Sequence, residues 1–462
     1  MVNDAAVVIL AAGQGTRMKS RMAKVLHRAG GKALVEHVID AAKGIAPAER
    51  IFVVVGHQAE AVAAVARNAG AGTIHQTEQL GTGHAVMCGE AQLAGLGGML
   101  LVLNGDCPLI RPETLGRLIE LYRETGSGAA MITTDLDDPA GYGRIIRDTS
   151  GRDASGDVLA IVEHKVATAE QRAIREINVG FYCFDAAAFW KHVHELRPDN
   201  PAHEYYLTDM IAILLRNGHR VTALKAEDSS EMLGINNRLE LAAADRNLRN
   251  RTVRQLMLDG VTIEKPETVT IDAQVKIGID TVVGPFAQIT GDTTIGENCR
   301  IGASCIVEDS TLEDEVEVFP FTSISACSLA KKAHAGPYAR LRMGAVLEEG
   351  AHVGNFVELK KTRLGKGSKS MHLAYLGDSV IGSKVNIGAG TITCNYDGAK
   401  KHPTHIGDGS FVGSNSTLVA PLEIAEGAYI AAGSVITDPV PAKALALGRA
   451  RQVIKEGWVR SS

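Results

Sequence analysis

The strongest constraint on this chain is an aliphatic repeat in its C-terminal half. Aliphatic residues recur every six positions at Ile271, Ile277, Val283, Ile289, Ile295, Ile301 and Val307. The spacing resumes in a new phase at Leu341, Leu347, Val353 and Leu359, then at Ile381 and Ile387, and finally at Ile406, Val412, Leu418, Ile424, Ile430 and Ile436. The repeat therefore covers approximately residues 262–437.

A period of six does not match the 3.6 residues per turn of an α-helix, but it suits short strands joined by tight turns around a narrow prism. The repeat predicts a parallel β-helix with three hexads per coil and each aliphatic side chain pointing inward. Gly278, Gly284, Gly296 and Gly302 directly follow four of the aliphatics. We expect these glycines at the corners, where a Cβ would crowd the turn.

The N-terminal half has a different pattern, in which apolar strands alternate with amphipathic helices. The expected strands cover 6–13, 51–56 and 99–106, and the expected helices cover 34–43 and 59–67. This alternation predicts a mostly parallel, doubly wound α/β sheet.

Residues 238–258 connect the two halves and contain leucines among many Ala, Arg and Glu residues, before Asp259 and Gly260. We interpret them as a connecting helix. The expected domains are therefore 1–237, a linker helix over 238–260, and 261–462.

Composition excludes several classes of function. The 462 residues are 45% hydrophobic and carry a formal net charge of −5, so no broad basic field is available to bind nucleic acid. The seven cysteines are odd in number and form no CxxC pair, which favours a reducing cytoplasm. The apolar run Ala5–Ala12 is too short to span a bilayer, and no membrane insertion is expected.

The loop LAAGQGTRM at 10–18 combines small residues with a cation, and a second cation follows at Lys24. Backbone amides in such a loop can cradle a phosphate, and Arg17 and Lys24 can neutralise it. The GxGxxG dinucleotide motif is broken at Met18, and no GxxxxGK[ST] motif occurs. A glycine-rich turn of this kind is often purely structural, so the loop alone does not decide the function.

The longer motif string is more specific. The loop is followed by AKVL at 23–26, EQLGTGHA at 78–85, NGDCPLI at 104–110, GYGRI at 141–145, IVEHKVA at 161–167, EINVG at 176–180 and GINNR at 234–238. In this order the motifs resemble those of the nucleotide-sugar pyrophosphorylases. Ala23 stands where that family usually has proline.

Asp106 ends an apolar strand at its carboxyl end, where open α/β sheets bind ligands, and its carboxylate suits Mg²⁺. The resemblance adds Asn236 as a second metal ligand. It assigns the nucleotide to Leu10, Ala11, Ala12, Gly13, Lys24, Asn104, Gly105 and Asp106, the uracil base to Gln76, Gly81 and Thr82, and the amino sugar to Gly143, Glu163 and Asn178. It thus implies transfer of a uridyl group from UTP, with Arg17 and Lys24 as catalytic cations.

Polar residues interrupt the repeat between 339 and 415. Arg342 and Lys360 could hold a sugar phosphate, and the His372 imidazole could take a proton from an attacking amine. A lone histidine in a turn is more often simply solvated, as we expect for His402 and His405, so His372 counts only together with its neighbours.

Taken together, the chain resembles the bifunctional enzymes that combine N-acetylglucosamine-1-phosphate uridyltransferase and glucosamine-1-phosphate N-acetyltransferase activities. The resemblance implies a left-handed β-helix, a homotrimer through that β-helix with acetyl sites between subunits, and His372 as the base. It assigns the sugar phosphate to Arg342, Lys360, Tyr375, Asn386, Asn395 and Tyr396, and acetyl-CoA to Ala389, Ser414, Ala432 and Arg449. Two features depart from its pattern: Met343 stands where the family commonly has proline, and the SKSMH stretch at 368–372 replaces a more usual glycine before the histidine.

Three alternatives stay open at this point. A single-activity sugar-phosphate nucleotidyltransferase with a structural β-helix predicts loss of His372 and its polar neighbours, and a non-catalytic scaffold predicts loss of Asp106, Lys24 or Arg17. All of these residues are present. A purine nucleotidyltransferase shares the glycine-rich loop, and only residues 76–82 favour uracil over it.

Overall fold

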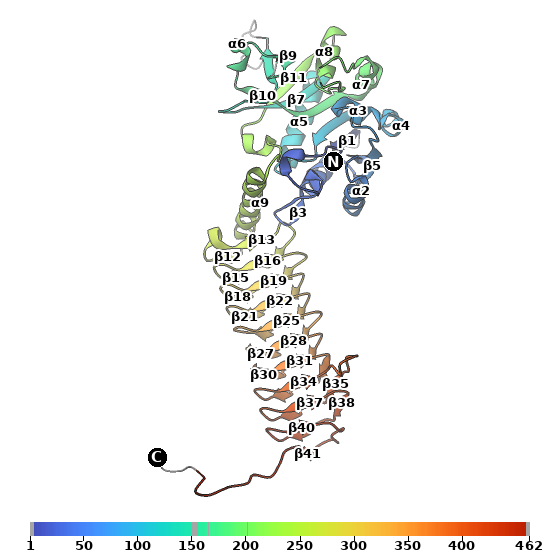
Figure 1. Ribbon diagram of the computed structural model, residues 1–462. Helices are drawn as coiled ribbons and strands as arrows, with labels where there is room; N and C mark the ends of the chain where they lie inside the picture. Colours follow the sequence, from blue (N-terminus) through green and yellow to red (C-terminus); the bar gives the residue numbers. More distant parts are fainter. Residues whose placement is uncertain (1–3, 149–155, 165, 201, 459–462) are drawn as a thin grey trace. The chain divides into compact units, whose positions relative to one another are not determined.

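The computed structural model describes residues 4–148, 156–164, 166–200 and 202–458, and the chain forms two compact units, residues 1–248 and 249–462 (Figure 1). In these described ranges no helix is long and apolar enough to cross a membrane.

The first unit is built on a mixed sheet with the strand order β11-β7-β10-β6-β1-β4-β5. These strands are β11 (Val221–Lys225), β7 (Ala129–Asp135), β10 (Glu176–Asp185), β6 (Met99–Asn104), β1 (Ala5–Leu10), β4 (Ile51–Val55) and β5 (Gly72–His75). Only β10 runs antiparallel to its neighbours along this path. Two further strands lie off the path: β8 (Arg144–Arg147) pairs with the start of β10, and β9 (Val158–Val162) pairs with β8. The prediction of a mostly parallel sheet is confirmed.

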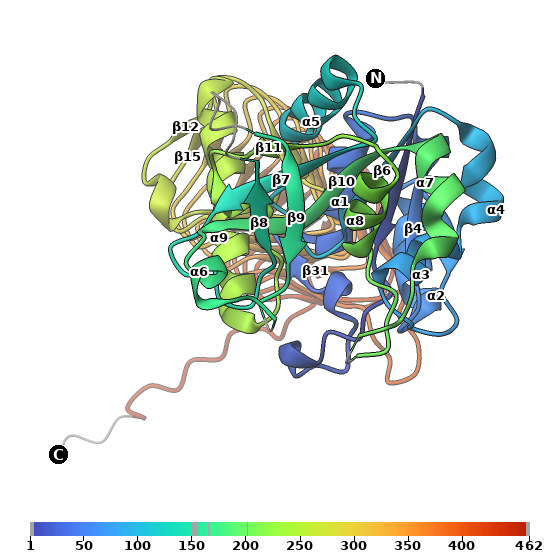
Figure 2. The ribbon, with the colours of Figure 1, turned by 90° about the horizontal axis from the view of Figure 1, so that it is seen from above.

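Helices cover both faces of this sheet (Figure 2). One face packs against α1 (Leu34–Lys43), α2 (Ala59–Asn68) and α5 (Pro112–Thr125), and the other against α3 (Thr82–Met87), α7 (Ala186–His192) and α8 (Asp209–Arg216). Along β1, Val7 and Ile9 belong to the first core, whereas Ala6 and Val8 belong to the second. The sheet is therefore buried on both sides, as a doubly wound fold requires.

Three shorter elements are α4 (Glu90–Leu93), α6 (Ala169–Arg172) and the hairpin of β2 (Arg28–Ala29) and β3 (Lys32–Ala33).

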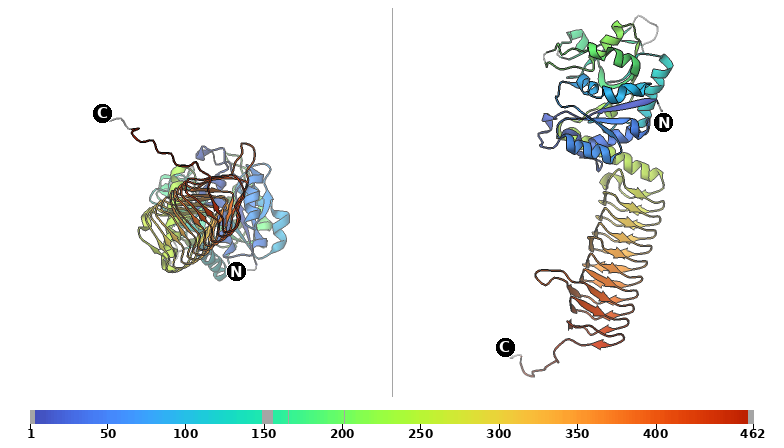
Figure 3. Two further views of the ribbon diagram at one scale, coloured as in Figure 1. Left: turned by 90° about the horizontal axis from the view of Figure 1, so that it is seen from below. Right: turned by 90° about the vertical axis from the view of Figure 1, so that its right-hand side faces the viewer.

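The second unit is a prism whose faces are three parallel sheets (Figure 3). The faces run from β12 (Thr262–Ile263) to β41 (Leu445–Ala446), from β13 (Thr270–Ile271) to β40 (Val435–Ile436), and from β14 (Lys276–Ile277) to β38 (Leu422–Ile424). Ile271 pairs with Ile289, which lies three hexads further along the chain. This register confirms the parallel β-helix with three hexads per coil.

The aliphatic repeat forms the interior of the prism, where its members are buried and only Ile277 is partly exposed. The wall also continues through 308–340, where the sequence pattern is interrupted. There, buried Leu312 follows Val307 and buried Leu329 follows Ile324 after five residues instead of six. A turn that is one residue shorter thus shifts the six-residue spacing of the buried aliphatics by one position, while the coils of the β-helix continue.

The corner glycines are required for a reason that differs in part from the expected one. A Cβ on Gly278 would lie 2.7 Å from the carbonyl carbon of Gly296, and a Cβ on Gly296 would lie 2.7 Å from the backbone nitrogen of Asp314. The crowding therefore comes from the backbone of the next coil, not from the turn itself.

Helix α9 (Arg238–Leu258) covers the residues for which a connecting helix is predicted. The boundary between the two compact units, at 248 and 249, falls inside this helix. The division of the activities at 237 and 260 stays a prediction.

Candidate functional site

The first unit has a cavity of about 270 Å³ at the carboxyl ends of β1, β5 and β6. Ten of the predicted nucleotide-binding residues line it: Leu10, Ala11, Ala12, Gly13, Lys24, Gln76, Gly81, Thr82, Asn104 and Asp106. Gly105 lies behind this wall, where its amide donates to the Leu10 carbonyl at 2.9 Å. The cavity is also lined by Val25, Gln79, Ala85 and Glu204, which sequence reasoning missed.

Of these four, Glu204 is the most distant in sequence from the other lining residues. It precedes α8 and lies outside all of the family motifs, so no signal for it was visible in the sequence. Gln79 and Ala85 lie inside the EQLGTGHA motif, and Val25 lies inside AKVL. Their position in the motifs was the only signal available for them in the sequence.

The glycine-rich loop holds Lys24 against the strand ends. Gly15 has φ +63°, and a Cβ there would lie 2.5 Å from the Cβ of Lys24. Only glycine allows this approach. Next to Lys24, the amide of Ala23 donates to Gln58 Oε1 at 2.8 Å, a bond that proline could not make because it has no N–H.

The two predicted metal ligands each have a cation as partner. Lys24 Nζ forms an ion pair with Asp106 Oδ2, and Arg17 Nη2 donates to Asn236 Oδ1 at 2.7 Å. The amide of Ile235 donates to the Asp106 carbonyl at 2.9 Å, which places Asn236 on a segment beside Asp106. Two cations and two side-chain oxygens that could bind a metal therefore lie on neighbouring segments at the carboxyl ends of the strands.

The three residues predicted for the amino sugar lie together near the β8–β10 edge. The Asn178 amide donates to the Gly143 carbonyl at 2.9 Å, and a Cβ on Gly143 would lie 3.4 Å from Glu163 Oε1. Burial raises the pKa of the Glu163 carboxyl, and the negative charge of Asp209 raises it further. A carboxyl in this environment is suited to hydrogen bonding with a neutral ligand.

In the second unit, the predicted phosphate-binding cations are stacked by strand register. Arg342 pairs with Lys360, one coil further on, between β25 (Arg340–Arg342) and β28 (Glu358–Lys360). Arg342 Nε donates to Glu358 Oε1 at 2.7 Å, and Lys360 Nζ donates to Asp378 Oδ2 at 3.1 Å. Because parallel strands lie about 4.8 Å apart, register alone brings the two cations close together.

Asp378 was not among the predicted residues. Its Oδ2 accepts hydrogen bonds from both Lys360 and Asn395, two residues assigned to the sugar phosphate. Burial by itself would raise the pKa of the Asp378 carboxyl, but these two donors bring it below its ordinary value. A charged Asp378 therefore fixes both side chains at once.

His372 ends β30 (Lys369–His372) and pairs in register with Asn355 on β27 (His352–Asn355). His372 Nδ1 lies 2.6 Å from Asn355 Oδ1. An amide oxygen only accepts, so this contact places the imidazole proton on Nδ1 and leaves the Nε2 lone pair available. Tyr375 follows at the start of β31 (Tyr375–Gly377), after a corner at Leu373 with φ +51°. Asn355 is a second residue that the sequence did not reveal.

The remaining acetyl-site predictions lie on later coils. Asn386 begins β33 (Asn386–Ile387) and pairs with Lys369 on the strand of His372, and Tyr396 is 60% exposed. The four acetyl-CoA candidates lie one per coil along one edge, as three contacts show: Asn415 N to the Ala389 carbonyl at 2.7 Å, Gly433 N to the Ser414 carbonyl at 2.8 Å, and Arg449 Nη1 to the Ala432 carbonyl at 3.0 Å.

Met343 has φ +57°, a conformation that the ring of proline cannot adopt. A proline at this position would therefore require a different local backbone. Arg342 Nη1 also contacts Met343 Sδ at 3.2 Å, so the new side chain packs against a predicted phosphate ligand.

Residues 395–403, where the spacing of six is lost, form a loop between β34 (Ile392–Cys394) and β35 (Thr404–Ile406). His402 Nε2 pairs with Asp397 at 2.7 Å, whereas His405 faces Glu423 at 3.8 Å. The two histidines have separate carboxylate partners. No cluster of three or more metal-ligating side chains occurs within residues 4–148, 156–164, 166–200 and 202–458.

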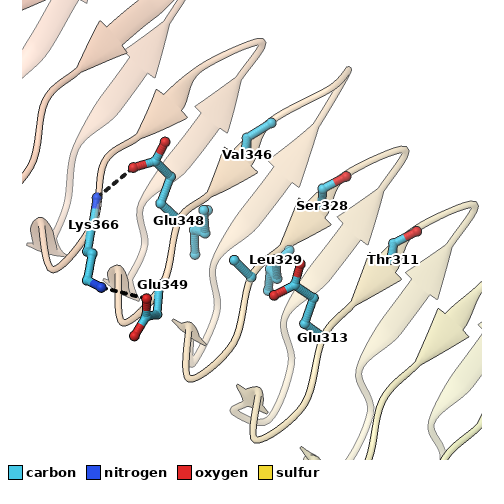
Figure 4. Close-up of a pocket in the computed structure, with 10 residues that line it drawn as sticks. Thr311, Glu313, Ser328, Leu329, Val346, Glu348, Glu349 and Lys366 are labelled. Atoms are coloured by element: carbon cyan, nitrogen blue, oxygen red, sulfur yellow. Dashed lines mark hydrogen bonds and ion pairs between the residues drawn. The ribbon is translucent and has the colours of Figure 1, made fainter.

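A larger groove on the prism, of about 490 Å³, is lined by residues between Thr311 and Lys366 (Figure 4). Lys366 Nζ pairs with Glu349 at 2.6 Å, and its backbone amide donates to Glu348 at 2.9 Å. None of the predicted site residues lines this groove, so its size does not make it the candidate site.

Known proteins resemble the chain over nearly its whole length. Residues 7–177 match the MobA-like NTP transferase domain, and residues 274–309 and 403–438 match the bacterial transferase hexapeptide family. The protein "Bifunctional protein GlmU" of Solibacter usitatus is 61% identical over 98% of this chain and 96% of its own length. Proteins with the same name from Koribacter versatilis and Pelobacter propionicus are 49% and 46% identical over at least 96% of either chain.

The chain belongs to the bifunctional GlmU family. The hexapeptide match supports the left-handed form of the parallel β-helix. Family membership and both domain matches make the chain an enzyme with a nucleotidyltransferase and an acetyltransferase activity. The scaffold and the single-activity alternatives are thereby set aside.

Proposed function

We propose that this chain makes UDP-N-acetylglucosamine in two steps at two sites. The β-helix unit transfers an acetyl group from acetyl-CoA to glucosamine 1-phosphate, and the sheet unit then transfers a uridyl group from UTP to N-acetylglucosamine 1-phosphate. The observation that carries the proposal is the cavity at the strand ends, where the Gln76–Thr82 segment faces the Lys24–Asp106 pair.

In the uridyl step, an oxygen of the sugar phosphate attacks the α-phosphorus of UTP and pyrophosphate leaves from the opposite side. No covalent bond to the protein is needed. Arg17 and Lys24 neutralise charge on the phosphates, and the amides of the loop at 10–18 orient them. Gly143, Glu163 and Asn178 hold the amino sugar.

The donor set fits Mg²⁺. Asp106 supplies a carboxylate and Asn236 an amide oxygen on neighbouring segments, and both are hard oxygen ligands. Two protein ligands are enough because Mg²⁺ usually keeps water and phosphate oxygens for the rest. When bound, the ion would neutralise charge on the triphosphate. Asp106 and Asn236 would hold it, and Lys24 and Arg17 would then be released toward the phosphates.

In the acetyl step, the amine of glucosamine 1-phosphate must lose a proton to attack the thioester of acetyl-CoA. His372 Nε2 has no partner among the residues that the structure describes and can accept this proton. Arg342, Lys360, Tyr375, Asn386, Asn395 and Tyr396 hold the sugar phosphate, and Ala389, Ser414, Ala432 and Arg449 contact acetyl-CoA.

The acetyl site is completed by a second copy of the chain in a homotrimer formed through the β-helix. The interior of the prism is filled by aliphatic side chains, so substrates cannot enter it. His372 and Tyr396 lie exposed on its surface. The cytoplasm suits the enzyme, because all seven cysteines are unpaired.

The test is to assay the purified chain with four nucleoside triphosphates and both sugar phosphates, with and without Mg²⁺, and to measure its mass by light scattering. We expect UTP-dependent uridyl transfer that requires Mg²⁺, acetyl transfer to glucosamine 1-phosphate, and about three times the 48.9 kDa chain mass. Equal turnover of ATP and UTP would contradict the uracil assignment. A monomer with full acetyltransferase activity would contradict the shared site.

A further inference from the structure

One polar side chain in the wall of the nucleotide cavity is almost completely buried. Gln76, directly after β5, is 4% exposed and lines the cavity. Its Nε2 donates to the Gly81 carbonyl at 3.0 Å and lies 3.2 Å from His84 Nδ1. Its Oε1 has no partner in the described part of the chain. The amide oxygen is therefore the atom that Gln76 offers to a ligand.

These contacts fix which way the amide points. A backbone carbonyl only accepts, so the terminal atom beside the Gly81 oxygen must be the amide nitrogen. Its second proton points to His84 Nδ1, which must then be an acceptor. Rotating the amide by 180° would place Oε1 against two acceptors and leave both without a donor, which is costly in a buried place.

The ring of His84 is itself held in place. Cys88 Sγ lies 3.7 Å from His84 Nε2 and 3.9 Å from His84 Nδ1, so the thiol packs against the ring beside both nitrogens. Helix α3, which carries His84, begins after Gly81 at φ +104°, and a Cβ on Gly81 would lie 2.7 Å from the Tyr205 carbonyl. The Gly83 amide donates to the same carbonyl at 2.7 Å. The histidine thus stands on a helix that is fixed to the segment before α8.

We infer that His84 is a positioning residue that makes the cavity select uracil over cytosine, by locking Gln76 with its amide oxygen toward the base. This inference rests on the proposed uridyl transfer. Uracil carries a proton on N3, which can be donated to Gln76 Oε1. Cytosine has a lone pair on N3, so two acceptors would face each other. A site with a fixed acceptor therefore binds the first base and rejects the second.

The experiment measures kcat/KM for nucleotidyl transfer to N-acetylglucosamine 1-phosphate with UTP and with CTP. In His84→Phe, the Gln76 amide keeps the Gly81 carbonyl but loses the second acceptor that holds it, and we expect the UTP-to-CTP ratio to fall by about tenfold through a higher KM for UTP and a gain with CTP. His84→Asn should restore most of the ratio, because the Asn side-chain oxygen can accept in place of Nδ1. His75→Phe is the matched control, since His75 precedes Gln76 but is exposed and does not line the cavity, and it should leave the ratio unchanged.

The possible outcomes separate this inference from the function on which it rests. Equal loss of rate with UTP and CTP in His84→Phe would mean that His84 only supports the fold, and would overturn the inference. If the phenylalanine variant does not fold, His84→Ala gives the same comparison. Failure of the asparagine variant to recover any selectivity would also overturn it. A parent chain that does not turn over UTP would instead contradict the proposed uridyl transfer.

Discussion

The two units of this chain assemble their candidate sites in different ways. In the β-helix, Arg342 and Lys360 come from consecutive coils and are neighbours by strand register. In the sheet unit, the cavity collects residues from segments as distant as Leu10 and Glu204. A repeat converts separation along the chain directly into separation in space, because each coil adds one strand spacing. In the sheet, the strand order must be known before any two segments can be placed together.

This difference affects how substitutions should act. A side chain in the sheet cavity is held by contacts with elements far away in the sequence, as Lys24 is by Asp106. A side chain on the prism is held by its neighbours one coil before and after it, as His372 is by Asn355. We expect each activity to be lost separately, and the predictions below test that separation.

The largest effect is expected for Asp106→Ala. The change removes the carboxylate that we assign to the metal and leaves Lys24 without its partner. Uridyl transfer should be abolished and acetyl transfer retained, as measured by separate assays on the same preparation. Asp40→Ala is a matched control, because it unpairs Lys32 at the exposed surface. Loss of both activities in a folded protein would show that the two sites are not independent.

The second effect is expected for His372→Ala. A general base contributes about 10² to 10⁴ in rate, so acetyl transfer should fall by that factor with little change in KM, and uridyl transfer should be unaffected. His352→Ala, on the adjacent strand, removes a histidine with no assigned role. If the His372 variant kept normal turnover and its rate rose with pH like that of the parent, another group would have to be the base.

A smaller effect is expected for Asp378→Asn, which keeps the size of the side chain but removes the charge that holds Lys360 and Asn395. Charge-assisted hydrogen bonds contribute about 1.5 to 3 kcal/mol, which corresponds to roughly a tenfold to hundredfold rise in KM for glucosamine 1-phosphate. The matched control Glu349→Gln removes an exposed partner of Lys366 in the groove. A change in kcat alone would argue against a positioning role for Asp378.

The smallest effect is expected for Glu163→Gln and concerns stability against pH. Burial and Asp209 raise the pKa of Glu163 in the folded state above its ordinary value, so the folded state binds this proton more tightly than the unfolded state does. The ionised carboxylate therefore destabilises the fold as pH rises through that raised pKa. Thermal unfolding should show the glutamine variant more stable than the parent at neutral pH and equal to it in acid. If the glutamine variant stayed more stable than the parent in acid, ionisation of the Glu163 carboxyl could not be the cause of the difference in stability.

Much of the fold could be predicted because its signals are local. The hexad aliphatics, the strands β1, β4 and β6, and helix α9 all follow from patterns within a few residues. The coils between 308 and 340 could not be recognised, because a step of five residues from Val307 to Leu312 removes the periodic signal while the strand pairing continues. The β-helix continues through these residues because their strands pair with the coils before and after them, and this pairing is not visible in the sequence.

The sequence by itself determined the two architectures, the motif residues around both candidate sites, and through its resemblance the pair of activities. Only the tertiary structure decided which partners hold those residues: Asp378 between Lys360 and Asn395, and His84 behind Gln76. The physical reason is one of range. Hydrophobic periodicity is set by neighbouring residues, whereas the direction of a buried amide or the partner of a buried cation depends on contacts that exist only after distant segments have packed together.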